Sequence, residues 1–317
     1  MRYLVGRLLQ ILPVMFMASI PVFLIIHLAE GDPVLMLLGV EATTESIEAM
    51  RHRLGLDQPL WQQYVNWIVG ILNGNVGRSV MSSFTVHDLL AQRIPATFAL
   101  AGVAILFAMI MAFPLGIVAA IRRGSVFDHI VTAGTSVAIA IPHFWLGIIF
   151  VLLFAVELNW LPAGGYVSPI DSPAKFAQLV FLPALTLSLY IAAALTRFVR
   201  TSMSEVLQLD YIRTAHSKGL SPATVILVHA ARNALIPAVT VVGVQFGRLL
   251  AGTIIVEAIF AWPGLGQLML SAINNRDFPV VQGAFLVFVV MVIVSNLVTD
   301  LLYSLIDPRI SLDGSQN

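Results

Sequence analysis

The amino-acid sequence predicts an all-α integral membrane protein with six transmembrane helices and both termini in the cytoplasm. Of its 317 residues, 58% are hydrophobic and 11% are charged, whereas soluble globular domains carry about 25% charged residues. Six apolar stretches are long enough to cross a bilayer, and each must be helical because lipid offers no partner to open backbone groups. These stretches are residues 11–29, 94–121, 129–156, 176–196, 233–256 and 278–299.

The basic residues predict the orientation. With a cytoplasmic N-terminus, the inner segments carry more Arg and Lys than the outer ones, as the positive-inside rule requires. Acidic residues gather in the first outer segment. Residues 11–29 are expected to be a retained helix, because this apolar stretch exceeds the roughly 7 to 15 residues of a signal-peptide core.

These spans divide the chain into four parts. Residues 1–29 form the N-terminal transmembrane helix, and residues 30–93 form an extracytoplasmic segment. Residues 94–310 form a five-helix core, and residues 311–317 form a C-terminal tail. Within the outer segment, apolar spacing predicts short helices over 42–54 and 60–71. A small extracytoplasmic cap and a docking surface for a partner are both open interpretations of this segment.

The longest cytoplasmic segment, residues 197–233, has the pattern of a short helix, a stop and a second helix. Gly219 suits the left-handed position that ends a helix. Ser221 and Pro222 suit the N-cap and first turn of the next helix. The segment therefore predicts a short helix with both ends held near the membrane, which is suited to act as a rigid lever for a cytoplasmic partner.

The run Trp262-Pro263-Gly264-Leu265-Gly266 must interrupt helical geometry. Apolar residues after it, at 268, 270 and 273, indicate a short interfacial helix. A simple turn in the outer aromatic belt also explains Trp262 but explains the length of the segment less well.

Several kinds of chemistry are absent from the sequence. Lysine occurs only at Lys175 and Lys218, so no phosphate-binding loop ending in Gly-Lys-Ser/Thr exists. The chain has no cysteine and no Gly-x-Ser-x-Gly or His-Glu-x-x-His motif. Its net charge of zero gives no basic field for nucleic acid. No acid lies deep in a predicted span, which disfavours a proton-coupled carrier. We therefore expect no enzymatic activity.

The cytoplasmic segment resembles the loop of ABC importer permeases that reads Glu-Ala-Ala, three residues, Gly, followed later by Ile-x-Leu-Pro. With the glycine placed on Gly219, Ala215 and Thr214 occupy the two alanine positions. Arg213 stands where the family has glutamate, a departure that reverses the charge there. The distal element is similar to residues 234–237.

Further blocks resemble the dipeptide/oligopeptide/nickel branch of this family, and in particular the first (B-type) of its two paired permeases. The resemblance covers nearly the whole chain. Its blocks are residues 31–33, 54–59 with 63–64, 123–128, 210–220 with 229–234, and 262–266 with 276–282.

The resemblance implies a type I ABC importer-like permease fold in the bacterial or archaeal cytoplasmic membrane. It implies a second homologous permease, two ATPase subunits and an extracytoplasmic substrate-binding protein as partners. ATP and Mg²⁺ would bind the ATPases, so no cofactor is expected in this chain. The implied function is ATP-driven uptake of dipeptides or oligopeptides. The residues implied in coupling to the ATPases are Asp210, Tyr211, Arg213, Thr214, Ala215, Lys218 and Gly219.

Other functions stay open. Within the family, the chain could serve a nickel-complex or glutathione importer. In a different class, it could be a channel or secondary carrier that works without ATPases, or a membrane scaffold. A nickel cargo would have no evident coordination site, because His129 and His216 have no partner at metal-ligand spacing.

Three residues are candidates for the translocation pathway: Arg248, His143 and Gln245. Arg248 is the one formal charge inside a predicted span, so it should face protein or water. It could line the pore and meet a peptide carboxylate, snorkel outward, or pair with Glu257. His143 follows Pro142, and the two predict a kink, although an interior histidine with satisfied hydrogen bonds is also open.

For docking of the binding protein, the candidates are Trp262, Arg276 and Asp277, which lie in the outer segment after the fifth span.

Overall fold

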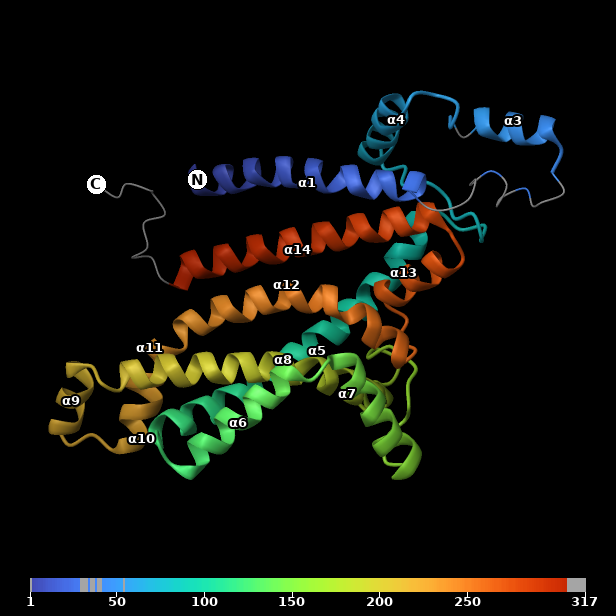
Figure 1. Cartoon of the computed structure of the whole chain (residues 1–317). Helices are drawn as coiled ribbons and strands as arrows, with labels where there is room; N and C mark the ends of the chain where they lie inside the picture. Colours follow the sequence, from blue (N-terminus) through green and yellow to red (C-terminus); the bar gives the residue numbers. More distant parts are fainter. Residues whose placement is uncertain (1, 29–33, 35–37, 39–41, 54, 307–317) are drawn as a thin grey trace. The chain divides into compact units, whose positions relative to one another are not determined.

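The computed structural model describes residues 2–28, 34, 38, 42–53 and 55–306. This part of the chain is helical, with an isolated antiparallel bridge between Arg78 and Thr85 (Figure 1). Two compact units divide it: residues 1–95 with 268–290, and residues 96–267 with 291–317. The main helices are α1 (Arg2–Leu28), α3 (Thr44–Arg53), α4 (Leu60–Leu72), α5 (Val86–Ile121), α6 (Val126–Ala140), α7 (His143–Phe150), α8 (Pro173–Val206), α9 (Asp210–Ser217), α12 (Ile236–Ile259), α13 (Leu265–Asn274) and α14 (Phe278–Ile306).

In the first unit, α4 packs against the C-terminal half of α1. The Tyr64 hydroxyl lies 2.7 Å from Ser19 Oγ, and the Tyr64 ring meets Phe23 edge to face. Gln63 Oε1 lies 3.1 Å from His27 Nε2. α3 and α4 confirm the two short helices predicted in the outer segment. Val34 and Leu38 aside, the outer-segment residues 29–41, with the predicted 31–33 block, lie outside the described residues.

In the second unit, α8 is the central helix. It packs against α6, α7 and α12, and Figure 1 draws it between α6 and α12. Of its apolar window 67% is buried, against 39% for α5 and for the apolar part of α12. A helix that is covered on most of its sides must make its contacts with protein rather than lipid, so α8 supplies much of the core of this unit.

Four helices in the described part of the chain, namely α5, α8, α12 and α14, are long and apolar enough to cross a membrane. The pair α6 and α7, with the π-helix η1 (Val151–Glu157), is a fifth if it counts as one span, and it bends by 99° at residues 141–142. This bend confirms the kink predicted at Pro142. The apolar part of α1, Ile11–His27, is shorter. The count of six spans and the cytoplasmic termini stay predictions.

The fifth predicted span needs a correction at its outer end. It was expected to stop at Val256, but α12 continues to Ile259 and therefore includes Glu257. The carboxylate is tolerated there because it is fully buried and hydrogen-bonded, as described below. The helix break at residues 260–264 and the following helix α13 confirm the pattern predicted from the Trp-Pro-Gly-Leu-Gly run.

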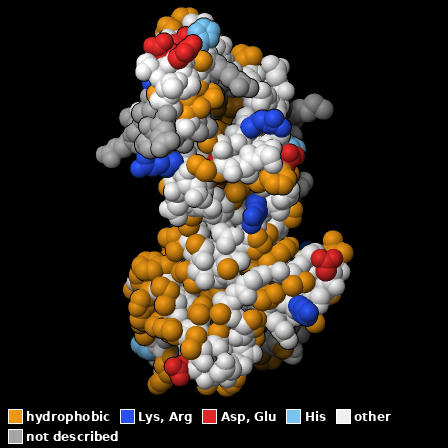
Figure 2. Space-filling model, turned by 90° about the vertical axis from the view of Figure 1, so that its right-hand side faces the viewer, with side chains coloured by type: hydrophobic (Ala, Val, Ile, Leu, Met, Phe, Trp, Pro, Cys, Tyr) orange, Lys and Arg blue, Asp and Glu red, His pale blue; other side chains and the backbone are white. Residues whose placement is uncertain are grey.

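The surface of the protein is rich in exposed hydrophobic side chains. Orange hydrophobic side chains far outnumber charged ones on the face drawn in Figure 2. On α5 and α6, exposed residues include Leu106, Ile110, Ile130 and Val137. A surface of this kind is suited to contact with lipid tails or another membrane subunit.

Candidate functional site

The helix α9 stands beyond the end of α8 (Figure 1). Most of its side chains are exposed. Ile212 and Ala215, three residues apart on one face, are 1% and 6% exposed. They belong to an apolar cluster with Met203 at the end of α8 and with Val225 and Ala230 in the next helix. Burial of this stripe fixes α9 onto the membrane part of the same subunit.

The end of α9 and the start of the next helix agree with the sequence. Gly219 has φ +77°, the left-handed conformation predicted for the residue that ends the helix. Ser221 Oγ accepts a hydrogen bond of 3.2 Å from the backbone N–H of Thr224, which confirms the predicted N-cap, and Pro222 follows in the first turn. The chain then forms the π-helix η2 (Val225–Ala230) and α11 (Ala231–Ala234).

The predicted coupling residues fall into two groups. Ala215 is buried inside this subunit and packs α9 in place. Tyr211 also acts partly within the subunit, since its hydroxyl donates to the His229 carbonyl at 3.3 Å and accepts from Asn233 Nδ2 at 2.9 Å. The remaining residues are exposed: Asp210, Arg213, Thr214, Lys218 and Gly219. This exposed group is the surface of α9 that a cytoplasmic partner would meet.

Arg213, which stands where the family has glutamate, forms an ion pair on this surface. Arg213 Nη1 lies 3.2 Å from Asp210 Oδ1, one turn away, with side chains 76% and 94% exposed. Exposed pairs of this kind contribute little stability, typically about 0 to 1 kcal/mol. Both charges therefore stay accessible to a partner at little cost.

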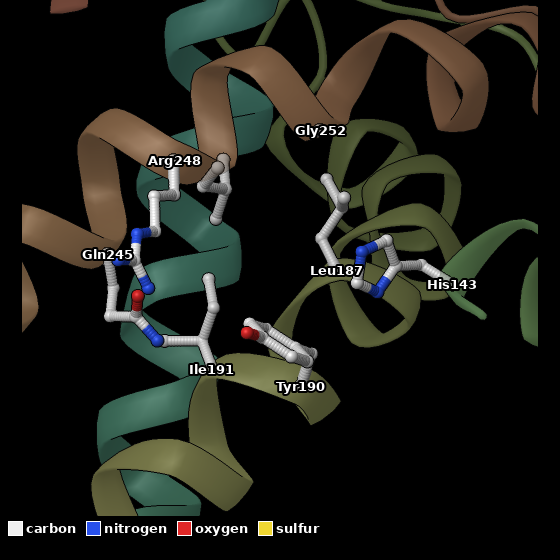
Figure 3. Close-up of a pocket in the computed structure, with 8 residues that line it drawn as sticks. His143, Leu187, Tyr190, Ile191, Gln245, Arg248 and Gly252 are labelled. Carbon is white, nitrogen blue, oxygen red and sulfur yellow. The ribbon is translucent and has the colours of Figure 1, made fainter. Parts of the chain in front are cut away.

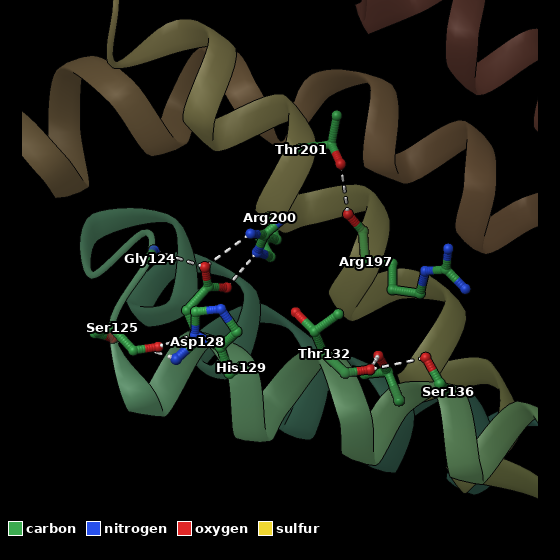
Figure 4. A network of polar contacts seen from close by, with 10 residues as sticks. Gly124, Ser125, Asp128, His129, Thr132, Ser136, Arg197, Arg200 and Thr201 are labelled. Atoms are coloured by element: carbon green, nitrogen blue, oxygen red, sulfur yellow. Dashed lines mark hydrogen bonds and ion pairs between the residues drawn. The ribbon is translucent and has the colours of Figure 1, made fainter.

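A second polar cluster joins α6 to α8 (Figure 4). The Arg200 guanidinium donates through Nε to Asp128 Oδ1 and through Nη2 to Oδ2, the latter at 2.8 Å. The backbone N–H of Gly124 also donates to Asp128 Oδ2, at 2.9 Å. The Asp128 side chain is 5% exposed and that of Arg200 29%. A two-pronged, largely shielded pair of this kind holds two helices in one register.

Sequence reasoning singled out residues 123–128 but missed this pair. Ser125 and Asp128 have the spacing of a helix N-terminal cap, and Ser125 Oγ does accept from the Asp128 N–H, at 3.3 Å. That local signal predicts the start of α6. The partner, Arg200, lies in a distant helix, and no spacing rule connects the two.

A cavity of about 290 Å³ lies between α7, α8 and α12. It brings together all three candidates for the translocation pathway, His143, Gln245 and Arg248 (Figure 3). The figure shows Gln245 and Arg248 on one side, from α12, and His143 on the other, with Tyr190 between them. Sequence reasoning missed the rest of the lining, which is Leu187, Tyr190, Ile191, Leu249 and Gly252. Their spacing along α8 and α12 is that of one helix face.

The docking candidates are placed differently from one another. Trp262 is 0% exposed, and its Nε1–H donates to the Ala96 carbonyl at 2.8 Å, so its side chain packs the subunit rather than facing a partner. Asp277 is 4% exposed and accepts from the Ser79 hydroxyl and, at 3.2 Å, from the Val80 N–H. Arg276, at φ +55°, is exposed. Of the three, Arg276 presents its side chain at the surface.

A buried carboxylate lies beside Trp262. Glu257 Oε1 accepts from the Thr97 hydroxyl at 2.7 Å, and Oε2 accepts from the N–H groups of Gly266 and Gln267 at 2.7 and 3.1 Å. The last two are free N–H groups at the start of α13, where a negative charge is favourable. Glu257 is therefore fully engaged at the end of α12. This arrangement does not support the alternative that Glu257 pairs with Arg248.

No group of three or more His, Cys, Asp or Glu side chains within the described residues is placed to hold a metal ion.

Comparison with known proteins covers nearly the whole chain. Residues 112–312 match the family model described as the inner membrane component of binding-protein-dependent transport systems, and residues 1–101 match the N-terminal model of such membrane components. The glutathione transport system permease protein GsiC of Escherichia coli is 41% identical over 98% of this chain and 99% of its own length. A putative peptide transport system permease of Brucella abortus is 41% identical, over 97% and 98%.

The di/tripeptide transport system permease DppB of Pseudomonas aeruginosa is 40% identical over 97% of this chain and 98% of its own. Among solved structures, a chain of the MetNI methionine ABC transporter in an inward-facing conformation has the same fold. It superposes with a TM-score of 0.58 over 69% of this chain and 96% of that one, at 18% identity.

Proposed function

Because the chain belongs to the inner-membrane permeases of binding-protein-dependent ABC importers, in the peptide family, we propose that it forms the pore with a second permease and is driven through α9 by two ATPase subunits. The family places it as a multi-pass protein of the inner membrane that acts in transport, together with other transporter subunits. The composition of two permeases, two ATPases and an extracytoplasmic binding protein is part of the proposal. ATP and Mg²⁺ would bind the ATPases.

The observation that carries the proposal is the two-sided character of α9. Its exposed face offers accessible polar residues, including Arg213 and Lys218, to a partner. Its buried face, Ile212 and Ala215, is packed on Met203 of α8 and on Val225. When the ATPases close on ATP and displace α9, the displacement passes through this close-packed contact to the spans, because packed interiors transmit strain rather than absorb it. Alternating access of the pore would follow.

For the cargo we propose dipeptides or oligopeptides. The relatives named for peptide and di/tripeptide transport match this chain as well as the one named for glutathione transport does. Glutathione is itself a small peptide, so the same permease chemistry serves it. A nickel complex is the remaining alternative in the family. The choice among these would rest largely with the extracytoplasmic binding protein.

The test is a charge reversal on the exposed side of α9. Lys218→Glu should lower ATP-dependent uptake of a labelled dipeptide and reduce co-purification of the ATPases, because the altered residue lies at the proposed contact. Stability should change little, since Lys218 is exposed. The matched control is Lys175→Glu, another exposed cation, near the start of α8.

Three results would contradict the proposal. Uptake that continues without ATP would indicate a channel or secondary carrier. Normal uptake and normal co-purification of the ATPases in Lys218→Glu would show that α9 does not contact the ATPases. Absence of any ATP-dependent uptake by the complete set of subunits would indicate a scaffold. Competition among dialanine, glutathione and a nickel–histidine complex in the same assay would identify the cargo.

A further inference from the structure

Arg248 has an unusual position for a charged side chain. It lies within α12, in the apolar segment Thr240–Ile259, and its side chain is exposed. An arginine at the centre of a membrane helix costs about 2.5 to 3.5 kcal/mol on insertion scales unless it meets water or a counter-charge. Among the residues that the structure describes, no carboxylate forms an ion pair with Arg248. Glu257, the nearest acid along α12, is engaged with α13.

The cavity that Arg248 lines has the character of a binding site for an anion. Its polar groups are the guanidinium of Arg248, the amide of Gln245, the Tyr190 hydroxyl and the His143 ring. No acidic residue lines it, and the remaining walls are Leu187, Ile191, Leu249 and the backbone of Gly252. Gln245 is 5% exposed, so its amide is held at the wall rather than in open solvent. Because none of the acids that the structure describes lines the cavity, the guanidinium of Arg248 meets no counter-charge there and is available to attract an anion.

We propose that this cavity binds the carboxylate of the cargo during translocation, with Arg248 as the cationic ligand and Gln245 and Tyr190 as hydrogen-bonding groups. Arginine suits this task because its fork of N–H donors matches a carboxylate. The ligand class is a small peptide with a free C-terminal carboxylate, and the apolar walls accept its aliphatic side chain. The proposal rests on the transport function proposed above and makes the permease itself, beside the binding protein, selective for anionic-ended cargo.

The chain offers a clean way to test this site, because it contains no cysteine. In Gly252→Cys the new side chain lines the cavity one turn from Arg248, and a Cβ there meets no atom within 4 Å. This single thiol can be modified in the complete transporter with an anionic reagent, 2-sulfonatoethyl methanethiosulfonate, and a cationic one, the trimethylammonium analogue. The matched control is Gly102→Cys, a helical glycine on α5 that also has open space and does not line the cavity.

We expect the ratio of anionic to cationic modification rates at Gly252→Cys to fall about tenfold when Arg248→Gln is added, and to be kept by Arg248→Lys. At Gly102→Cys the ratio should not respond to Arg248→Gln. Millimolar dialanine should protect Gly252→Cys from modification, whereas dialanine amide should not. The protection measurement needs no change at Arg248, so it stands even if Arg248→Gln fails to fold.

An unchanged rate ratio in Arg248→Gln, or equal protection by dialanine and its amide, would overturn the assignment. An acid from a partner subunit that neutralises Arg248 would produce the first of these results. Neither measurement uses ATP. The anion site can therefore fail while ATP-dependent uptake persists, and loss of ATP dependence would contradict the transport proposal while leaving the rate ratio intact.

Discussion

A substitution series at Gly219 separates the backbone requirement at the end of α9 from any contact made there. Gly219 has φ +77°, and a Cβ built on it meets no atom of this chain within 4 Å. A side chain at this position is therefore penalised through backbone conformation alone. Asparagine adopts the left-handed region more readily than alanine, and β-branched valine is the least suited to it.

The magnitude follows from the backbone. Placing alanine in the left-handed region costs about 1 to 2 kcal/mol, which corresponds to a roughly 5- to 30-fold shift in the equilibrium between the native helix end and alternatives. Gly219→Asn should cost less than this and Gly219→Val more. Because nothing packs against the added atoms, the loss falls on the end of α9 and the thermal unfolding midpoint of the whole protein should change little.

Initial rates of ATP-dependent peptide uptake, normalised to the amount of permease in the membrane, measure the effect. Activity is expected to fall in the order wild type, Gly219→Asn, Gly219→Ala, Gly219→Val. Uptake by Gly219→Val should be near zero, although its membrane insertion is normal. Wild-type uptake in Gly219→Val would refute the assignment of α9 as the coupling element. A loss as large in Gly219→Asn as in Gly219→Val would refute the backbone argument and indicate that a partner subunit fills the space beside Gly219.

Three further predictions concern packing in the second unit. Asp128→Asn should lower the thermal unfolding midpoint in detergent, since it removes the charge facing Arg200, at a cost of about 2 to 4 kcal/mol discounted for the partial exposure of that arginine; a midpoint equal to wild type would show that the pair does not hold α6. Trp262→Phe should destabilise by about 1 to 3 kcal/mol, because it removes the indole hydrogen bond to the Ala96 carbonyl and part of a fully buried side chain, and an unchanged denaturation midpoint would count against that role. In Gly243→Ala the new Cβ collides with the Thr299 side chain, so stability should fall. Thr299→Ala should restore part of the loss in the double variant, because it removes Oγ1 and Cγ2 but keeps Cβ at 2.7 Å; additive effects of the two changes would exclude their contact.

Features that depend on local sequence were predictable. The left-handed glycine at 219 and the cap at Ser221 each act over a few residues, and both are found where the sequence places them. The bend at Pro142 follows from the missing N–H of proline. Arg248 was identified because a lone charge in an apolar span requires an explanation, and the structure places it beside the other two pathway candidates, His143 and Gln245, in one cavity.

Features that depend on distant segments were not predictable. Asp128 and Arg200 lie 72 residues apart, and Thr97 and Glu257 lie 160 apart. The first pair joins α6 to α8, and the second joins α5 to the end of α12. Trp262 illustrates the same limit, since its aromatic ring beside a helix break fits an exposed belt residue as well as the buried donor that it is. Only the three-dimensional packing distinguishes these two cases.

The π-helix η2 determines how the residues after it are rotated relative to the residues before it in the cytoplasmic segment. Hydrogen bonds in a π-helix join residues five apart, whereas those in an α-helix join residues four apart. The helix η2 therefore holds one more residue than an α-helical turn would, between Val225 and the alanines that follow. Each residue of an α-helix advances the chain by about 100°. Loss of that residue would turn Ala231 and Ala234 away from the cluster that seats α9 and bring polar neighbours in their place. The number of residues between α9 and α12, rather than their composition, therefore determines whether α9 packs against its apolar cluster.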